Sequence, residues 1–250
     1  MSTHNNPLGR RNSPLLCYVT DRHALGIANP AGSLAALVQK IEEVVASGID
    51  WVQIREKDLP ARELASLTRQ ALAIAAKYSA KRSSTVRVSV NDRFDVALAE
   101  RAEGVHLGES SLAVAEAKRL MRSAVQKQVV GETFMIGVST HSVEAAQAAE
   151  QDGVDYIFFG PIFPTPSKLH FGPPQGTELL QQVCRAVSIP VLAIGGITDE
   201  NAASCTVAGA AGIAAIRLFQ DAHDPLCTIR RLHQLSMDSR LQPPGDPPAS

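Results

Sequence analysis

The segment QDGVDYIFFG, residues 151–160, places a glycine shortly before an apolar run, and three other segments repeat this arrangement. They are ASGIDWVQI (46–54), RAEGVHLG (101–108) and AGAAGIAAI (208–216). The four glycines, Gly48, Gly104, Gly153 and Gly212, recur every two strand–helix units. A glycine that follows a helix adopts the left-handed conformation at low cost, so we interpret these four as helix C-caps before strands two, four, six and eight.

Outward from these segments, the chain contains eight apolar runs of strand length. They are LLCYVT (15–20), WVQIR (51–55), VRVSV (86–90), GVHLG (104–108), MIGVS (135–139), YIFFG (156–160), PVLAIGG (190–196) and GIAAIRL (212–218). Their apolar residues are mostly continuous, as is typical of strands buried on both faces in a parallel sheet. The stretches between them have helical spacing, and several begin with a capping residue, such as Ser33, Ser142 and Asp199.

Eight strand–helix units in residues 15–235 predict a single (β/α)8 barrel, the TIM-barrel fold. The alternative is an open, doubly wound sheet, which usually has a glycine-rich turn after its first strand. Here the first strand runs into TDRHALG (20–26), which is not a GxGxxG motif and favours the barrel. Residues 1–14 are polar, and residues 236–250 are rich in proline, so we expect both to be disordered tails.

Composition excludes several classes of protein. The chain has 250 residues, of which 45% are hydrophobic, and a net charge of −1, which argues against wholesale disorder and against a protein that binds nucleic acid by neutralising phosphates. The chain has no apolar run long enough to span a membrane, and its first residues do not form a secretory signal. Four scattered cysteines indicate neither a zinc site nor a disulfide framework, so we expect a cytoplasmic protein. Whether it forms a homo-oligomer stays open.

In a (β/α)8 barrel the active site forms at the C-terminal ends of the strands. The second strand ends in Gln53, Arg55 and Lys57, which alternation points to one side, while Ile54 packs on the other. A guanidinium and an ammonium beside an amide suit a phosphate or a diphosphate. The alternative is a solvated strand end with an Arg–Glu pair.

Other strand ends supply further candidates. Asn91 and Asp92 follow the third strand, where Asp92 could ligate Mg2+ or either residue could cap the next helix. His106 on the fourth strand is more typical of a buried core residue. After the fifth strand, Ser139 suits a hydrogen bond to a heterocycle, and His141 is a candidate acid or base or a residue at the start of a helix.

The last three strands contribute a second group. The sixth leads into a long loop, 160–176, rich in glycine and proline, with Lys168 near its middle, and such loops are often functional lids. The seventh ends in the pair Gly195 and Gly196, and the eighth in Ile216 and Arg217. The loops after these two strands often bind phosphate in barrels of this kind.

Six segments in order, CYVTDR, VQIREKD, VNDRFDVALAERAEGVHLGE, IGVSTHS, DYIFFGPIFPTPSK and PVLAIGGIT, resemble the thiamine phosphate synthase/thiazole tautomerase superfamily. The resemblance covers nearly the whole predicted domain. It implies a transferase that joins an aminopyrimidine diphosphate to a thiazole phosphate, giving thiamine phosphate and diphosphate, with Mg2+ as cofactor. Both substrates are small molecules, and neither nucleic acid nor a membrane is implied as a partner.

The resemblance also implies roles for individual residues. The pyrimidine diphosphate positions are Gln53, Ile54, Arg55, Glu56, Lys57, Asn91, Ser139 and Lys168, and the catalytic ones among them are Arg55, Lys57, Ser139 and Lys168. The thiazole phosphate positions are Thr165, Pro166, Ser167, Gly196, Ile216 and Arg217. Asp92 falls on a metal position, and Ser111 stands where the family usually has a second metal-binding Asp.

Two departures keep other functions open. Ser111 stands in place of an Asp, and its neutral hydroxyl is a weaker ligand for Mg2+ than a carboxylate. Arg217 stands where the family often has Ser. A thiazole tautomerase, in which a histidine such as His141 moves a proton, is one alternative. A non-catalytic protein that binds thiamine precursors is the other. The intact Gln53, Arg55 and Lys57 set favours the transferase, because a tautomerase has no diphosphate to hold.

Overall fold

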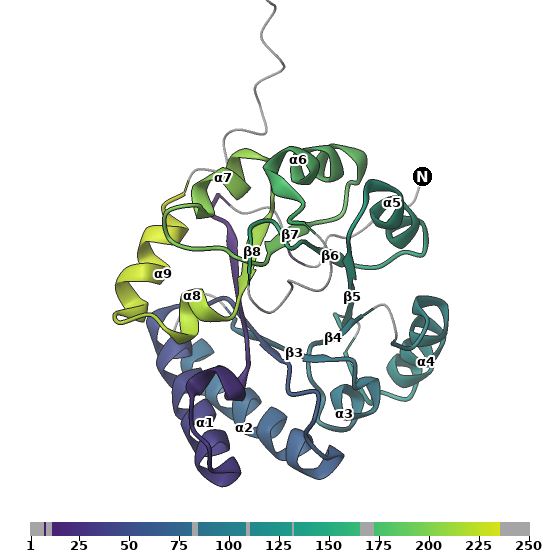
Figure 1. Ribbon diagram of the computed structural model, residues 1–250. Helices are drawn as coiled ribbons and strands as arrows, with labels where there is room; N and C mark the ends of the chain where they lie inside the picture. The colour runs from purple at the N-terminus through teal and green to yellow at the C-terminus, as the bar shows by residue number, and fades with distance from the viewer. Residues whose placement is uncertain are drawn as a thin grey trace, which may run out of the picture.

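The computed structural model describes residues 8, 12–81, 85–108, 111–131, 133–165 and 173–235. Within these residues, eight parallel strands form one closed barrel in sequence order, and the helices surround it (Figure 1). The strands are β1 (Leu15–Val19), β2 (Trp51–Ile54), β3 (Arg87–Asn91), β4 (Gly104–Leu107), β5 (Met135–Thr140), β6 (Tyr156–Phe159), β7 (Val191–Ile194) and β8 (Gly212–Ala215). The helices are η1 (Arg22–Leu25), α1 (Pro30–Ser47), α2 (Ala61–Ser79), α3 (Phe94–Ala99), α4 (Val114–Gln126), α5 (Val143–Gln151), α6 (Gly176–Ala186), α7 (Ala202–Val207), α8 (Arg217–Gln220) and α9 (Pro225–His233). The predicted (β/α)8 barrel is confirmed.

The strands are buried on both faces, which explains their continuous apolar sequences. On β2, for example, Trp51 faces an inner cluster of the barrel, whereas Val52 and Ile54 belong to the outer core between strands and helices. The inner cluster also contains Tyr156 and Phe158 of β6, and Leu8 packs in it as well. The barrel is therefore a packed core, and any ligand has to bind at one of its ends.

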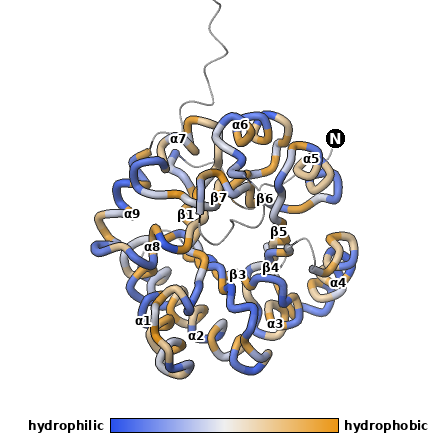
Figure 2. The backbone as a smooth tube through the Cα atoms, in the orientation of Figure 1, coloured by the Kyte–Doolittle hydropathy of each residue, from blue (hydrophilic) through white to orange (hydrophobic). Residues whose placement is uncertain are grey.

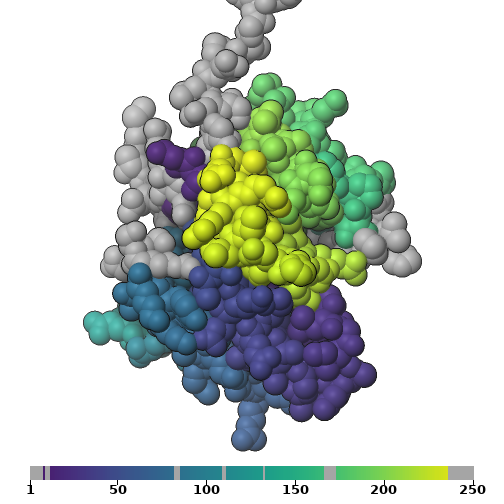
Figure 3. All heavy atoms as spheres, turned by 90° about the vertical axis from the view of Figure 1, so that its left-hand side faces the viewer, coloured from purple at the N-terminus to yellow at the C-terminus, as the bar shows by residue number. Residues whose placement is uncertain are grey.

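The helices bury one face against this barrel. In α1 the buried residues Leu37, Ile41 and Val44 recur at helical spacing, and Figure 2 shows hydrophobic and hydrophilic stretches alternating along the helices. The helix α9 packs on α1, so the last described helix lies beside the first α-helix and completes the ring (Figure 3). No helix among the described residues is long and apolar enough to cross a membrane.

The four repeated glycines have two different roles. Gly48 and Gly153 follow helices in the left-handed conformation, with φ of 116° and 76°, as predicted. The prediction is wrong for Gly104 and Gly212, which are the first residues of β4 and β8. A Cβ on Gly104 would lie 2.6 Å from the carbonyl oxygen of Met135, and close approach of neighbouring strands, not backbone conformation, requires glycine there.

Three local predictions need correction. Ser33 lies inside α1, which Asn29 caps, and its hydroxyl donates to the carbonyl of Pro30. Asp199 does not cap α7 but pairs with Arg231, whereas Ser142 caps α5 as predicted. The eighth strand ends at Ala215, and Arg217 opens the short helix α8, because the chain turns helical as soon as it leaves the barrel.

An acidic residue directly before each of β2, β4 and β6 is the common element of three repeats. The carboxylates of Asp50, Glu103 and Asp155 accept the N–H of the second residue of the preceding strand, at 3.0, 2.8 and 2.7 Å. The main-chain N–H of each acidic residue donates to the carbonyl of that same strand residue. These side chains thus extend the ladder beyond the N-terminal end of each strand. In the fourth repeat, Ala211 makes only the main-chain contact, to Val191.

This arrangement predicts the effect of Asp155→Ala. The substitution leaves the N–H of the buried Ile136 without its carboxylate acceptor, which should lower the free energy of unfolding by about 1–3 kcal/mol. Urea denaturation measures the change. Asp152→Ala is the matched control, because Asp152 is exposed at the end of α5 and should leave stability unchanged. Equal stability of the two variants would show that the hydrogen bond from Ile136 to the Asp155 carboxylate contributes nothing to the free energy of unfolding.

Candidate active site

The predicted metal residue Asp92 lies in an unusual turn at the C-terminal end of β3. Its φ is 62°, a left-handed conformation that Asp tolerates better than most residues. Asp92 does not cap α3, since that helix begins without a side-chain cap. The turn instead brings the carboxylate to the end of β4, where Oδ1 accepts the N–H of Gly108 at 3.1 Å.

Several donors converge on the Asp92 carboxylate. The hydroxyl of Ser111 donates to Oδ1, Asn91 Nδ2 donates to Oδ2 at 2.9 Å, and Lys57 Nζ lies 3.6 Å from Oδ2. Burial opposes ionisation of this group, but the bonds from Ser111 and Gly108 and the charge of Lys57 outweigh it and lower the pKa of Asp92. The two predicted metal residues are therefore in direct contact, and the carboxylate is ionised at neutral pH.

Gln53 and Asn91 form a polar layer under this carboxylate. Gln53 Nε2 donates to Asn91 Oδ1 at 3.3 Å. The side chain of Gln53 is buried, and its Oε1 has no hydrogen-bond partner among the described residues. A buried amide oxygen without a partner is costly, so this atom is available for a donor on a bound molecule.

The segment that follows β2 alternates between the barrel mouth and the core, as predicted. Lys57 is exposed and faces Asp92, and Arg55 is half-buried. Ile54 and Glu56 are buried, so a ligand can reach these two only through the main chain. The Glu56 carboxylate accepts the Thr20 hydroxyl at 2.7 Å and Arg22 Nη1 at 2.9 Å.

Thr20 and Arg22 are functional candidates that the sequence analysis missed. Thr20 Oγ1 also accepts the N–H of Arg55 at 2.9 Å, and the Arg22 guanidinium additionally binds Asp58. Together they fix the main chain on both sides of Glu56 and thereby hold Arg55 and Lys57 at the mouth. The polar run directly after the first strand is the signal that could have identified them, because it lies at the end of the barrel that carries the site.

Ser139 lies at the end of β5, half-buried, and His106 of β4 lies behind it. His106 Nε2 is 2.9 Å from Ser139 Oγ, and Nδ1 is 3.3 Å from the hydroxyl of Tyr156. Burial lowers the pKa of His106 to about 3, since the opposing charge of Asp92 cannot compensate, and Arg55 and Lys57 lower it further. His106 is thus a neutral core histidine, as its position suggested.

His141 is held by the main chain. Its Nδ1 donates to the carbonyl of Gly160 at the end of β6, and the residue is half-buried just before the capping residue of α5. This contact fixes the ring between two strand ends. It is compatible with both alternatives in the sequence, a residue at the start of a helix and an acid or base at the mouth.

The second group of candidates lies at the C-terminal ends of β6, β7 and β8. A Cβ on Gly196, whose φ is 67°, would lie 2.6 Å from the carbonyl oxygens of Phe163 and Pro164, so the glycine lets the loop after β6 pack closely. Thr165 is half-buried at the end of the described part of this loop, Ile216 is half-buried and Arg217 is exposed. Pro166, Ser167 and Lys168 lie outside the described residues, so their predicted roles stay predictions.

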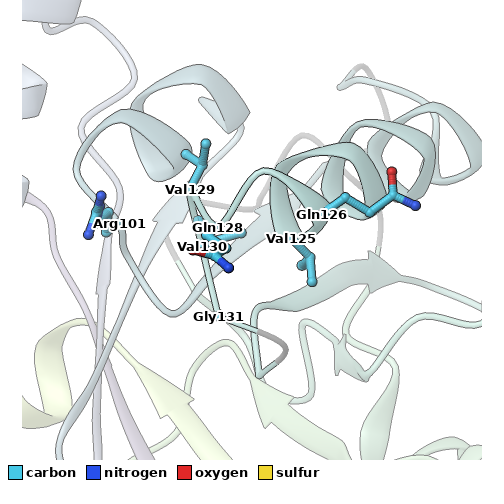
Figure 4. Close-up of a pocket in the computed structure, with 7 residues that line it drawn as sticks. All are labelled: Arg101, Val125, Gln126, Gln128, Val129, Val130 and Gly131. Atoms are coloured by element: carbon cyan, nitrogen blue, oxygen red, sulfur yellow. The ribbon is translucent and has the colours of Figure 1, made fainter.

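A cavity lies near the N-terminal ends of the strands, away from the candidate active site. It has a volume of about 490 Å3 and is lined by Arg101, Val125, Gln126, Gln128, Val129, Val130 and Gly131 (Figure 4). These residues lie in and around the loops that lead into β4 and β5, at the N-terminal ends of the strands. Arg101 is the one titratable side chain among them, so we do not assign the active site to this cavity.

The barrel and the polar groups at its C-terminal mouth define a class, the (β/α)8-barrel enzymes. Within it, the family model described as thiamine monophosphate synthase matches residues 16–219. The chain belongs to this thiamine monophosphate synthase family.

Individual relatives agree with this assignment. The chain is 38% identical to the thiamine-phosphate synthase of Roseiflexus castenholzii over 232 residues, which are 92% of each protein. It is 40% identical to a putative thiamine-phosphate synthase of Geobacter sulfurreducens over 210 residues, 84% of this chain and 88% of the relative. Among solved structures, it resembles the thiamine phosphate pyrophosphorylase of Pyrococcus furiosus with a TM-score of 0.73 and 29% identity, covering 92% of this chain and 98% of the other.

Proposed function

We propose that this protein is a thiamine phosphate synthase that acts on an aminopyrimidine methyl diphosphate and a thiazole phosphate. The bond between the methylene carbon and the diphosphate oxygen breaks, and diphosphate leaves with the electron pair. The thiazole nitrogen then forms a bond to that carbon, giving thiamine phosphate. Membership of the family carries the proposal, and the ionised Asp92 beside Lys57 at the mouth supports it.

The side chains at the mouth suit a reaction in which negative charge builds up on a leaving group. Arg55 and Lys57 supply cations that are in place before the bond breaks, held there by the contacts of Thr20 and Glu56. Such preorganised charge stabilises a transition state without reorganisation. The reaction needs no protein nucleophile. In our proposal Lys168 completes the cationic set, and Gly196 and Arg217 lie at the thiazole phosphate.

The donor set suits Mg2+. Asp92 and Ser111 offer a carboxylate and a hydroxyl oxygen at one point, and Mg2+ commonly combines one or two carboxylates with water and substrate phosphate oxygens. No group of three His, Cys, Asp or Glu side chains in the described ranges could hold a metal. In our proposal the substrate diphosphate would complete the site. When bound, Mg2+ supplies positive charge at the leaving diphosphate.

Because Ser111 stands at the metal position, we expect this protein to need a high Mg2+ concentration for coupling. A neutral hydroxyl is a weaker ligand than a carboxylate, so Ser111→Asp should lower the Mg2+ concentration that gives half-maximal coupling, by roughly tenfold for one added charged ligand. A titration of coupling rate against Mg2+ measures this. Ser111→Asn, which adds similar volume without charge, is the control. If the Asp and Asn variants have the same Mg2+ requirement as the parent protein, Ser111 does not lie at the metal.

The position of His141 supports a second candidate function, thiazole tautomerisation. It lies at the mouth, and a tautomerase would need one residue to move a carbon-bound proton. In the synthase reaction this residue has no required chemical step.

Two variants separate these functions. Arg55→Ala should lower the coupling rate about ten- to a hundredfold, because it removes a charge-assisted contact to the diphosphate. His141→Ala should retain most coupling activity. Arg69→Ala, which removes an exposed arginine of α2, is the control and should behave like the parent protein. The opposite result would support the tautomerase: the parent protein and Arg55→Ala isomerise the thiazole phosphate without coupling, and His141→Ala does not.

A further inference from the structure

A buried hydrogen-bond chain connects the barrel interior to the proposed pyrimidine site. It consists of Trp51, Ser89, Tyr156, His106 and Ser139, of which all but Ser139 are buried. The indole Nε1–H of Trp51 donates to Ser89 Oγ at 2.9 Å. The Tyr156 phenol lies next to Ser89 in the core, and the centroid of its ring is 4.7 Å from that of the Trp51 ring. His106 links Tyr156 to Ser139 through its two ring nitrogens.

The chain has a direction because one of its ends can only donate. An indole has an N–H and no acceptor, so Trp51 occupies a lone pair of Ser89. Ser89 can then give its own hydrogen to Tyr156, and Tyr156 can give its hydrogen to Nδ1 of His106. In this order each hydroxyl both accepts and donates, and no buried hydrogen lacks an acceptor.

The reverse order fails at Ser89. If His106 Nδ1 donated to Tyr156, the phenol would have to donate to Ser89, which already accepts from Trp51. The Ser89 hydrogen would then have no acceptor in the chain, and a buried hydroxyl without its hydrogen bond is costly. The forward order also keeps His106 neutral, in agreement with its burial and with its two ring-nitrogen partners, which are both hydroxyl groups among the described residues.

We infer that Trp51, through Ser89 and Tyr156, fixes His106 as the Nε2–H tautomer, so that Ser139 accepts from His106 and presents its own hydroxyl hydrogen to the substrate. His106 and Tyr156 are then positioning residues, and the hydroxyl hydrogen of Ser139 is available for an acceptor on the substrate. This inference rests on the proposed function in one respect, that the pyrimidine diphosphate binds beside Ser139. The acceptor of this hydrogen is a ring nitrogen or a diphosphate oxygen of the pyrimidine substrate.

The tautomer can be observed in the free protein. In protein labelled with 15N at histidine, the long-range 1H–15N correlations of His106 should show a proton on Nε2 and none on Nδ1 at neutral pH. A proton on Nδ1, or on both nitrogens, would overturn the inference. This measurement needs no substrate, so it stands even if the protein does not couple the two precursors.

A matched pair of variants tests the consequence for binding. Tyr156→Phe removes the hydrogen that holds Nδ1 as an acceptor, so the KM for the pyrimidine diphosphate should rise about two- to tenfold while the KM for the thiazole phosphate is unchanged. Tyr18→Phe is the control. Tyr18 is equally buried and donates to Gln220 at 2.8 Å, away from Ser139, so it should lose stability without a change in either KM.

The outcomes separate a positioning role from a structural one. Equal KM values in Tyr156→Phe and Tyr18→Phe, or a parallel rise for both substrates, would contradict the inference. Binding of the pyrimidine alcohol, which lacks the diphosphate, identifies the acceptor. If Tyr156→Phe weakens its binding by the same factor, Ser139 faces a ring nitrogen, and if the alcohol is unaffected while the diphosphate is weakened, Ser139 faces the diphosphate.

Discussion

Asp92→Asn should lower the coupling rate about 10²–10³-fold while the protein stays folded. The substitution removes the carboxylate that our proposal assigns to Mg2+ and leaves the amide oxygen to accept from Gly108. Asn adopts left-handed backbone as readily as Asp, so the turn with φ of 62° is retained. The loss should therefore appear in activity and in the Mg2+ requirement, with little change in the free energy of unfolding.

Asp95→Asn is the matched control for this prediction. Asp95 lies three residues further on at the start of α3, where it pairs with Arg93 and is exposed. Removing its charge should leave the coupling rate within about twofold of the parent rate. If Asp92→Asn keeps activity at the same Mg2+ concentration, the carboxylate is not a metal ligand and the metal site has to be sought elsewhere.

Gly137→Ala should cause a large loss of stability. A Cβ at Gly137 would lie 2.0 to 2.3 Å from three ring atoms of Tyr156, its partner on β6. The Tyr156 ring is fully buried among Trp51, His106 and Phe158 and has no space to move. Overpacking of this kind costs about 3 kcal/mol or more, which corresponds to a fall in Tm of roughly 6–12 °C for a domain of this size.

The control is Gly131→Ala. Gly131 is exposed before β5, and the nearest atom to an added Cβ, Thr133 Oγ1, is 3.7 Å away, an ordinary contact. Thermal unfolding followed by circular dichroism measures both variants, and Gly131→Ala should unfold at the parent temperature. A Tm for Gly137→Ala within about 2 °C of the parent value would show that the inner core can rearrange around the ring.

The sequence predicted the elements well, because each strand is a local apolar run and each helix has local periodicity. It also predicted which side chains of β2 share a face, since Gln53, Arg55 and Lys57 alternate with Ile54 and Glu56. For two of the four repeated glycines the prediction failed because of close packing between strands. Gly104 and Gly212 look like C-caps in the sequence, but their neighbours across the sheet, Met135 and Leu15, are far away in the chain.

The connections within the site could not be predicted for the same reason. Glu56 looks like part of a cationic motif, and its partner Arg22 is 34 residues earlier. His106 meets Tyr156 across 50 residues and the three elements α4, β5 and α5, so its tautomer depends on strand order and register that no local pattern contains. Contacts of this range follow from the closed barrel, which fixes which strand ends face each other.

The most direct test of the central claim is a coupling assay with the purified full-length chain, Mg2+, the aminopyrimidine methyl diphosphate and the thiazole phosphate. The account predicts that thiamine phosphate and diphosphate appear in equal amounts, and that neither forms when one substrate is left out. A folded protein that releases no diphosphate and makes no thiamine phosphate, or that only isomerises the thiazole phosphate, would contradict it.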